Sequence, residues 1–403
     1  MMCASATDFP PLRLRKNEER RLRAGHLWVY SNEVDIDATP LKLFEPGQAV
    51  TLQAHNGKAL GTGYVNPHSL ICARLLSRDP AYPFSPSLLA HRLDLALSLR
   101  QRLYPQPYYR LIYGEADGLP GLIVDRYADV CVVQLTTAGM EQLKQAVLAA
   151  LIEVLQPTAV LWRNDSAVRA LEGLPGYVET ALGSIPETVR LEENGVAFEA
   201  PLATGQKTGW FFDQRDNRAR LLKYGRERRV LDVFSYLGGW GIQAAVHGAR
   251  EVWCVDSSAR ALELVRANAA LNAVADRVDV VQGDAFAVLK SLREAREHFD
   301  IVILDPPAFI KRKKDFKEGL QAYRRLDELA LQLLAKDGLL ISCSCSYHLP
   351  GETLEQVILQ TVRHLDRSMQ ILERGQQAPD HPIHPAIPET AYLKAVFARI
   401  LPA

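Results

Sequence analysis

Apolar residues in the second half of the chain form five short runs, and segments with helical spacing separate them. The first run begins at Val230, and the others occupy residues 251–256, 278–282, 299–304 and 338–344. Short apolar runs bounded by turn residues are typical of buried strands, and their alternation with helices indicates a parallel sheet. The pattern predicts an open α/β sheet.

A polar residue stands at the carboxyl end of each run. These residues are Asp232, Asp256, Asp284, Asp305 and Cys345. The carboxyl ends of the strands face one crevice in an open parallel sheet. We therefore expect these side chains to converge on a single site.

A glycine-rich turn, Gly238-Gly239-Trp240-Gly241, follows the first run and precedes a predicted helix at 242–247. Missing side chains in such a turn allow the backbone to approach a nucleotide-type cofactor. Dinucleotide sites favour G-x-G-x-x-G, which this turn matches poorly. S-adenosylmethionine instead needs an acid for its ribose and an acceptor at its adenine edge, and Asp256 and Asp284 fit these roles. Together with Asp305-Pro306-Pro307, this favours a methyltransferase over a dehydrogenase.

The first half of the chain predicts two further domains. Turns at Pro46-Gly47 and Asn56-Gly57 separate short apolar runs, the second turn being typical of a hairpin. A proline-containing linker at 80–86 follows. We expect a β-rich domain at 1–79, a central α+β domain at 80–195, and the α/β domain at 196–403.

The central domain is expected to consist of local elements without chemistry of its own. Leucines at helical spacing predict a helix at 87–105. A tight loop entering a strand is expected at 110–127, then a strand at 130–135, a helix at 141–155 and a strand at 159–163. Its glycines fit turns.

Positive charge gathers locally, although 47 Lys+Arg balance 47 Asp+Glu over the chain. The first cluster, which includes Arg20, Arg21 and Arg23, precedes aromatic residues and suits phosphate contact with base stacking. A solvated basic helix before a core tryptophan explains it equally well. The second cluster is Lys311, Arg312, Lys313 and Lys314. Its place beside the predicted crevice favours phosphate contact over an ordinary solvated face.

The segment 204–218 contains more polar and aromatic residues than a connector needs. Lys207 or Arg215 could bind the methionine carboxylate of the cofactor, and the aromatic residues could enclose its adenosine. The alternative is an ordinary helix start with Asp213 near the N-cap. The position just before the first run favours the functional interpretation.

Six scattered cysteines without C-x-x-C spacing predict neither a disulfide scaffold nor a zinc site, so we expect no metal. No apolar run has membrane-spanning length, and the first residues lack a signal-peptide pattern. We expect a reducing, cytoplasmic setting and no membrane partner.

Taken together, the motifs resemble the RNA cytosine-C5 methyltransferases that act on large-subunit ribosomal RNA, which combine a PUA domain, a central domain and a Rossmann-like methyltransferase domain. The matching stretches include His26-x-Trp28, 114–121, 207–209, 213–215, 234–239, 305–307, 344–346, Asp380-His381-Pro382 and 388–394. The resemblance implies S-adenosylmethionine as cofactor, 23S rRNA or a large-subunit precursor as partner, and allows a homodimer.

The resemblance also implies which residues form the site. The contacts to cofactor or target base are Lys207, Gln214, Arg215, Phe234, Ser235, Tyr236, Gly238, Gly239, Asp256, Asp284 and Asp305. The implied nucleophile is Cys345.

Cytosine C5 is a weak nucleophile, which explains why such an enzyme needs a thiol. A thiolate that adds at C6 makes C5 enamine-like and able to accept a methyl group. Cys345 is favoured over Cys343, because cysteines inside strands are mostly small hydrophobic residues. Asp305 is suited to the hydrogen bond at N3. The two-cysteine cytosine enzymes have a cysteine directly after the proline, where this chain has Pro307-Ala308.

Two other functions stay open at this point. Amino-group methyltransferases also use an acid-Pro-Pro motif, but they usually place an aromatic residue directly after it and do not need Cys345. A non-catalytic RNA-binding or ribosome-assembly factor could keep the same fold. The presence of Asp256, Asp284, Asp305 and Cys345 argues against that alternative.

Overall fold

The computed structural model describes residues 9–79, 82 and 85–403. Cys3 and most of the expected linker at 80–86 lie outside these residues. Contacts divide the chain into two compact units. The first comprises Met1–Val189, Pro201–Trp210 and Pro379–Thr390, and the second comprises Arg190–Ala200, Phe211–Ala378 and Ala391–Ala403. The three domain boundaries expected from the sequence stay a prediction.

The N-terminal part of the first unit is β-rich, as expected. Its sheet has the strand order β1-β3-β4-β5-β2. The strands are β1 (Pro11–Arg13), β2 (Trp28–Val29), β3 (Gln48–Gln53), β4 (Ala59–Val65) and β5 (Ala73–Ser77), with the short helix α1 (Glu19–Arg23). Gly57 adopts φ 80° in the predicted hairpin between β3 and β4, a conformation that glycine tolerates without strain.

The rest of the first unit is an α+β layer. Its sheet has the order β10-β9-β8-β7-β6. The strands are β6 (Tyr108–Tyr113), β7 (Leu122–Tyr127), β8 (Val130–Leu135), β9 (Ala159–Asn164) and β10 (Tyr177–Leu182), and the helices are α2 (Pro86–Leu103), α3 (Ala138–Gln142) and α4 (Lys144–Leu155). The Ser85 side chain accepts from Leu88 N and caps α2.

Two expectations for this layer were wrong in detail. Residues 110–127 form strand β6, a 3-10 turn and strand β7, because Asp117 accepts from Tyr113 N at 2.6 Å and Gly118 closes the turn at φ 71°. The single helix expected at 141–155 is two helices, which meet at Leu143. Both errors concern local hydrogen bonds that periodicity does not register.

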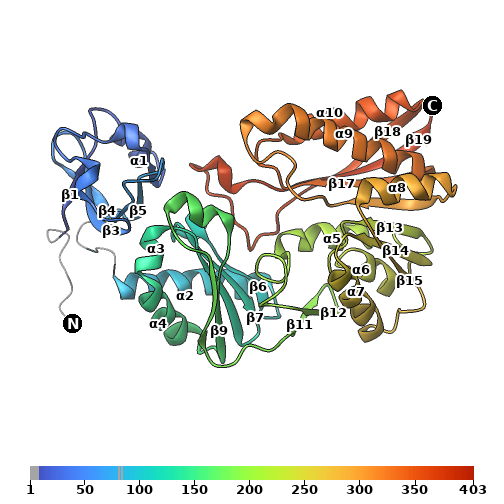
Figure 1. Cartoon of the computed structure of the whole chain (residues 1–403), viewed down its shortest axis with the longest axis horizontal. Helices are drawn as coiled ribbons and strands as arrows, with labels where there is room; N and C mark the ends of the chain where they lie inside the picture. The colour runs from blue at the N-terminus through green and yellow to red at the C-terminus, as the bar shows by residue number, and fades with distance from the viewer. Residues whose placement is uncertain (1–8, 80–81, 83–84) are drawn as a thin grey trace. The chain divides into compact units, whose positions relative to one another are not determined.

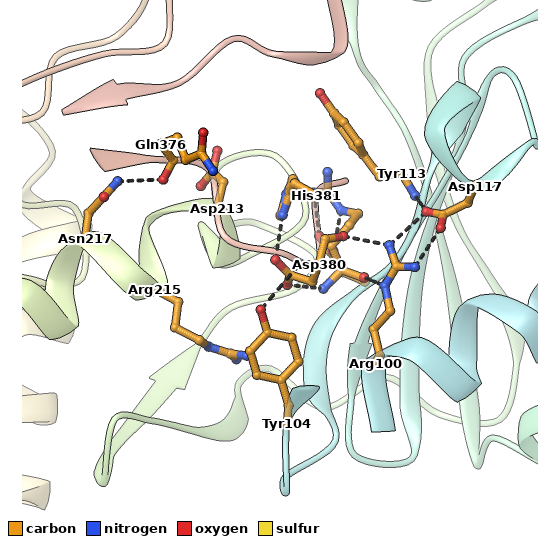
Figure 2. Close-up of polar contacts among 12 residues, drawn as sticks. Arg100, Tyr104, Tyr113, Asp117, Asp213, Arg215, Asn217, Gln376, Asp380 and His381 are labelled. Carbon is orange, nitrogen blue, oxygen red and sulfur yellow. Dashed lines mark hydrogen bonds and ion pairs between the residues drawn. The ribbon is translucent and has the colours of Figure 1, made fainter. Parts of the chain in front are cut away.

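The segment Pro379–Thr390 belongs to the first unit and is fixed there by buried polar contacts. The Arg100 guanidinium donates to the Asp117 carboxylate at 2.6 and 2.8 Å and to the main-chain oxygen of Asp380 at 2.7 Å (Figure 2). The Asp380 carboxylate accepts from Arg110 N and lies 2.8 Å from the His381 ring. The Asp380-His381 motif therefore anchors the chain to this unit.

The second unit contains a seven-stranded sheet with the order β15-β14-β13-β16-β17-β19-β18. The strands are β13 (Arg229–Val233), β14 (Glu251–Asp256), β15 (Val278–Gln282), β16 (Phe299–Leu304), β17 (Leu334–Ser344), β18 (Arg367–Gln376) and β19 (Lys394–Pro402). β13 to β17 pair in parallel, whereas β19 is antiparallel to both β17 and β18. β11 (Val189–Glu193) and β12 (Val196–Ala200) form a separate two-stranded sheet.

Helices cover both faces of the seven-stranded sheet. α6 (Gly241–Val246) and α7 (Ala259–Leu271) pack on one face, and α8 (Ala285–Glu294), α9 (Phe316–Leu333) and α10 (Gly351–His364) pack on the other (Figure 1). α5 (Arg215–Leu221) contacts β18. The predicted α/β fold and its five strands are confirmed. No helix in the described part of the chain is long and apolar enough to cross a membrane.

Candidate active site at the carboxyl edge of the sheet

The loop after β13 is held in an uncommon backbone conformation. Phe234 and Tyr236 have φ of 66° and 49° although neither is glycine. Such residues cost about 1–3 kcal/mol each and persist only where the surroundings fix them. Here the Asp256 carboxylate accepts from Tyr236 N and Ser258 N, both at 2.9 Å. Asp256 therefore ties the ends of β13 and β14 together.

The glycines of this loop were expected to let the backbone approach a cofactor, but the positions where their side chains would be face protein atoms. A Cβ at Gly241 would lie 2.7 Å from Cys254 Sγ, one at Gly238 2.7 Å from Ile242 Cδ1, and one at Gly239 2.9 Å from Arg218 Nε. The glycines thus permit close packing of loop, helix and strand.

Asp232, at the end of the first run, is fully buried and contributes to the same packing. It accepts from Gly241 N at 2.9 Å, and burial raises its pKa to about 7. Asp284 differs, because it is exposed and caps α8 by accepting from Ala287 N. The acids expected to converge thus divide into buried and exposed groups.

Asp305, directly after β16, is joined to two distant segments. Its carboxylate accepts from Gln214 Nε2 at 2.9 Å and from Trp240 Nε1 at 3.1 Å. Burial raises the pKa of Asp305, while the Trp240 and Gln214 hydrogen bonds and the Arg218 charge oppose that rise. Gln214 was expected at the site, whereas Trp240 was considered only as part of the glycine turn.

Arg215 lies in the second unit and is engaged by a buried acid. Glu193 accepts from Arg218 at 2.7 Å, and its other oxygen lies 3.7 Å from Arg215 Nε. No sequence motif had indicated Glu193, and Arg218 was noted only as the last residue of the segment 204–218. Lys207 belongs to the first unit. The expected helix start near Asp213 is present, since α5 begins at Arg215 with Gln214 as its N-cap. Asp213 itself lies in the preceding 3-10 turn and accepts from the Tyr392 hydroxyl.

Cys345 directly follows β17 and is partly exposed, whereas Cys343 lies inside the strand and is fully buried. Burial raises the pKa of the Cys343 thiol well above its ordinary value, which disfavours its thiolate. The Cys345 Sγ lies 3.9 Å from the main-chain oxygen of Pro306. The Asp-Pro-Pro segment and Cys345 thus meet at the ends of adjacent strands.

Side chains from two other elements hold the segment around Cys345. The Tyr323 hydroxyl on α9 lies 2.8 Å from Ser344 Oγ and 3.1 Å from Ser346 Oγ. Lys394 Nζ on β19 donates to the main-chain oxygens of Ser346 at 2.6 Å and Tyr392 at 2.8 Å. Sequence reasoning missed Tyr323, and it noted Lys394 only within a family motif.

The two basic clusters differ in the ion pairs that their side chains form within the protein. Arg21 donates to both oxygens of Glu33 and covers the Tyr30 ring at 4.7 Å, while Arg20 and Arg23 are exposed. In the second cluster, Arg312 pairs with Asp315 on the surface. Lys313 and Lys314 of the same cluster line a hollow of about 440 Å³, together with Phe316, Lys317 and His348. We call it the basic hollow.

Two protein-family models match this chain and together cover most of it. A PUA-like domain matches residues 12–78, and an S-adenosylmethionine-dependent methyltransferase matches residues 130–399. Two proteins named ribosomal RNA large subunit methyltransferase I are similar from end to end. The protein from Aliivibrio fischeri is 35% identical over 394 residues, which are 96% of this chain and 98% of that protein. The protein from Salmonella arizonae is 34% identical over 400 residues, 98% of each.

Solved structures share the fold at lower identity. A Streptococcus mutans protein described as a SAM-dependent methyltransferase gives a TM-score of 0.81 at 22% identity, covering 97% of this chain and 100% of that chain. A second structure, described as a methyltransferase complexed with SAH, gives 0.82 at 22% identity with the same coverage. The chain therefore belongs to the S-adenosylmethionine-dependent methyltransferase family, with a PUA-like domain preceding the methyltransferase region.

Proposed function

We propose that this protein methylates C5 of a cytosine in large-subunit ribosomal RNA. The observation that carries the proposal is a partly exposed thiol, Cys345, beside Asp305-Pro306-Pro307 at the carboxyl edge of a methyltransferase sheet. The names of the relatives support ribosomal RNA of the large subunit as substrate. The PUA-like domain supports RNA as the partner.

The residues at the ends of β14 and β15 fit S-adenosylmethionine. Each oxygen of Asp256 accepts one main-chain N–H, and a carboxylate offers about four lone-pair sites in all. Two acceptor positions thus remain for the hydroxyls of a ribose. Asp284 is exposed and uses Oδ1 for its cap, which leaves Oδ2 for the adenine amino group.

The remaining cofactor contacts belong to the same proposal. Phe234, Ser235, Tyr236, Gly238 and Gly239 are proposed as cofactor contacts from the loop after β13, in which Tyr236 N donates to Asp256. Gln214 is proposed to orient Asp305 by donating a hydrogen bond to its carboxylate, and Arg215 is proposed to be held in place by Glu193. Lys207 stays a sequence-based prediction.

When bound, S-adenosylmethionine supplies the methyl group that C5 receives. Before that, the Cys345 thiolate forms a bond to C6, and the electron pair of the C5–C6 double bond makes C5 nucleophilic. Asp305 is proposed to donate a proton or a hydrogen bond to N3 of the cytosine. Burial raises the pKa of Asp305, which favours the protonated carboxyl that this donation needs. A base then removes the C5 proton, the S–C6 bond breaks, and the double bond and the thiolate are restored.

The basic hollow is proposed as the place where the RNA backbone approaches Cys345. It combines Lys313, Lys314 and Lys317 with the Phe316 ring, and His348 comes from the loop just after Cys345. Cations with an aromatic face suit phosphates and an unstacked base. Lys311 and Arg312 extend this surface, and Arg20 and Arg23 are proposed as further phosphate contacts. Arg21 is proposed to orient α1 through Glu33.

Amino-group methylation is the second candidate, and the position of Phe309 disfavours it. In that chemistry an aromatic residue after the prolines stacks on the target base. Here Phe309 packs on Tyr323 with ring centroids 4.9 Å apart and on Phe286 at 6.4 Å. Its ring thus contributes to the core between the sheet and α9.

A trapping experiment tests the proposal. An RNA containing 5-fluorocytosine cannot lose a proton from C5, so the bond between Cys345 and C6 should persist after methylation. We expect a covalent complex that requires S-adenosylmethionine, forms with Cys343→Ala, and is lost with Cys345→Ala. Methyl transfer without any adduct would favour the amino-group reaction, and no transfer to any ribosomal RNA would favour a binding factor.

A further inference from the structure

Lys394, on the neighbouring antiparallel strand, is placed next to Cys345 by its backbone pairing and by its side chain. In the pairing of β17 with β19, Lys394 is opposite Ser344, the residue before Cys345. Its ammonium group donates at 2.6 Å to the main-chain oxygen of Ser346, the residue after Cys345. The backbone pairing with Ser344 and the ammonium's hydrogen bond to Ser346 together hold the Lys394 side chain near Cys345.

Titratable groups lie near Cys345 on the elements packed around the end of β17. Tyr323 faces the segment from α9, Cys343 lies two residues earlier on β17, and Asp305 follows the adjacent strand β16. The Arg218 charge acts on Cys343, and Arg218 is paired with Glu193, whereas Lys394 contacts the main chain directly after Cys345. Burial lowers the pKa of Lys394 to about 8, and the Cys345 charge acts in the opposite direction. At neutral pH the side chain is therefore still mainly an ammonium ion.

We propose that Lys394 is a positioning residue that favours the thiolate form of Cys345, an inference that rests on the proposed function for its role in catalysis. An ammonium within a few ångströms favours ionisation of a thiol, whose proton passes to solvent. The two main-chain hydrogen bonds hold the charge in place. C-terminal strand β19 thereby contributes to the reactivity of a residue on β17.

Alkylation of Cys345 tests this without RNA or cofactor. The intact protein is treated with iodoacetamide over a range of pH, and the rate at Cys345 is followed by peptide mass spectrometry. For Lys394→Met we expect the midpoint of the profile to rise by about one pH unit. The rate at neutral pH should fall by about threefold, since a tenfold loss of thiolate is offset in part by its greater nucleophilicity. Above both midpoints the variant should react faster than the wild type.

Lys394→Arg is the conservative control, because it keeps the charge, and its midpoint should stay near that of the wild type. If Lys394→Met does not fold, Lys394→Gln replaces it. A rate that changes by the same factor at every pH, with an unmoved midpoint, would show a merely structural role and overturn the inference. A shifted midpoint in a protein that never traps 5-fluorocytosine RNA would keep the Lys394–Cys345 pair and reject cytosine methylation.

Discussion

The two halves of the carboxyl edge of the seven-stranded sheet are built differently. After β13, β14 and β15, carboxylates accept from main-chain N–H groups, as Asp256 does from Tyr236 and Asp284 does from Ala287. After β16 and β17, side chains bind one another: Asp305 accepts from Trp240 and Gln214, and Ser344 and Ser346 contact Tyr323.

The two halves also differ in how far apart the hydrogen-bonded residues are in the sequence. In the first half the partners are 2, 3, 9 and 20 residues apart. In the second half most partners are farther apart, by 21, 23, 48, 65 and 91 residues, although Ser346 N also donates to Ser344 Oγ two residues away. A half held by local main-chain contacts is suited to binding a common cofactor, whereas the reactive half depends on how distant elements pack.

The strongest test of this comparison is Cys345→Ala. Loss of the nucleophile should reduce methyl transfer at least about a thousandfold, because the other site residues cannot replace a covalent intermediate. The affinity for S-adenosylmethionine should stay near wild type, since the proposed donor contacts lie in the first half. Radiolabel transfer and calorimetry measure the two effects, with Cys343→Ala as control. Activity that survived in Cys345→Ala but not in Cys343→Ala would reverse the assignment.

Asp327→Asn tests the packing beneath the reactive half. Asp327 on α9 is fully buried, accepts from Ser342 Oγ at 3.1 Å, and has a pKa raised by burial to about 7 from 3.8. The folded state therefore holds the proton more tightly than the unfolded state, and wild-type stability falls as pH rises through this window. Asparagine cannot ionise, so the variant should gain stability relative to wild type from about pH 4 to pH 7, by at most about 4 kcal/mol.

Urea unfolding of both proteins at several pH values measures that gain. Asp279→Asn, at an exposed acid of β15, is the surface control, since a substitution there should change stability by no more than about 0.5 kcal/mol. A difference between wild type and Asp327→Asn that did not vary with pH would contradict the raised pKa.

Gly241→Ala probes the first half through its backbone. The new Cβ would lie 2.7 Å from Cys254 Sγ and 2.9 Å from Val252 Cγ1, inside the core between α6 and β14. We expect a loss of about 1–3 kcal/mol in unfolding free energy, as in other overpacked cores. Gly225→Ala is the matched control, because its nearest neighbours would be 3.7 and 3.9 Å away. Equal effects of the two substitutions would show that the turn is not tightly packed.

Asp256→Asn should weaken S-adenosylmethionine binding by about tenfold, or about 1.4 kcal/mol, since the amide offers fewer acceptor sites to the loop and the ribose. Reactivity of Cys345 toward iodoacetamide should not change, because the thiol lies in the other half. Calorimetry and the alkylation rate measure the pair of effects. Unaltered cofactor affinity would exclude Asp256 from the donor site.

The smallest effect is expected at the basic hollow. Lys313→Glu should weaken RNA binding by about threefold at low salt and lower the salt dependence of the affinity by about one ion. Lys336→Glu makes the same charge change near the start of β17, at the opposite end of the strand from Cys345. If both variants lose affinity equally, the effect reflects net charge alone.

The sequence by itself determined the α/β class, the five parallel strands and the acids that end them. It did so because a strand, a turn and a cap are specified by residues close together in the chain. Asp256 and Asp284, for example, stand at strand ends that apolar runs mark directly. The family motifs also indicated the cofactor before any geometry was known.

Only the tertiary structure decided which partners those residues have. It showed that Gly241 serves packing against Cys254, that Asp305 is bound by Trp240 and Gln214, and that Lys394 lies opposite Ser344. Periodicity carries no information about these pairs, since they depend on where β19, α5 and the glycine turn pack after the chain has closed long loops. Contacts across such separations arise from the summed packing of the whole unit, which no short stretch of sequence encodes.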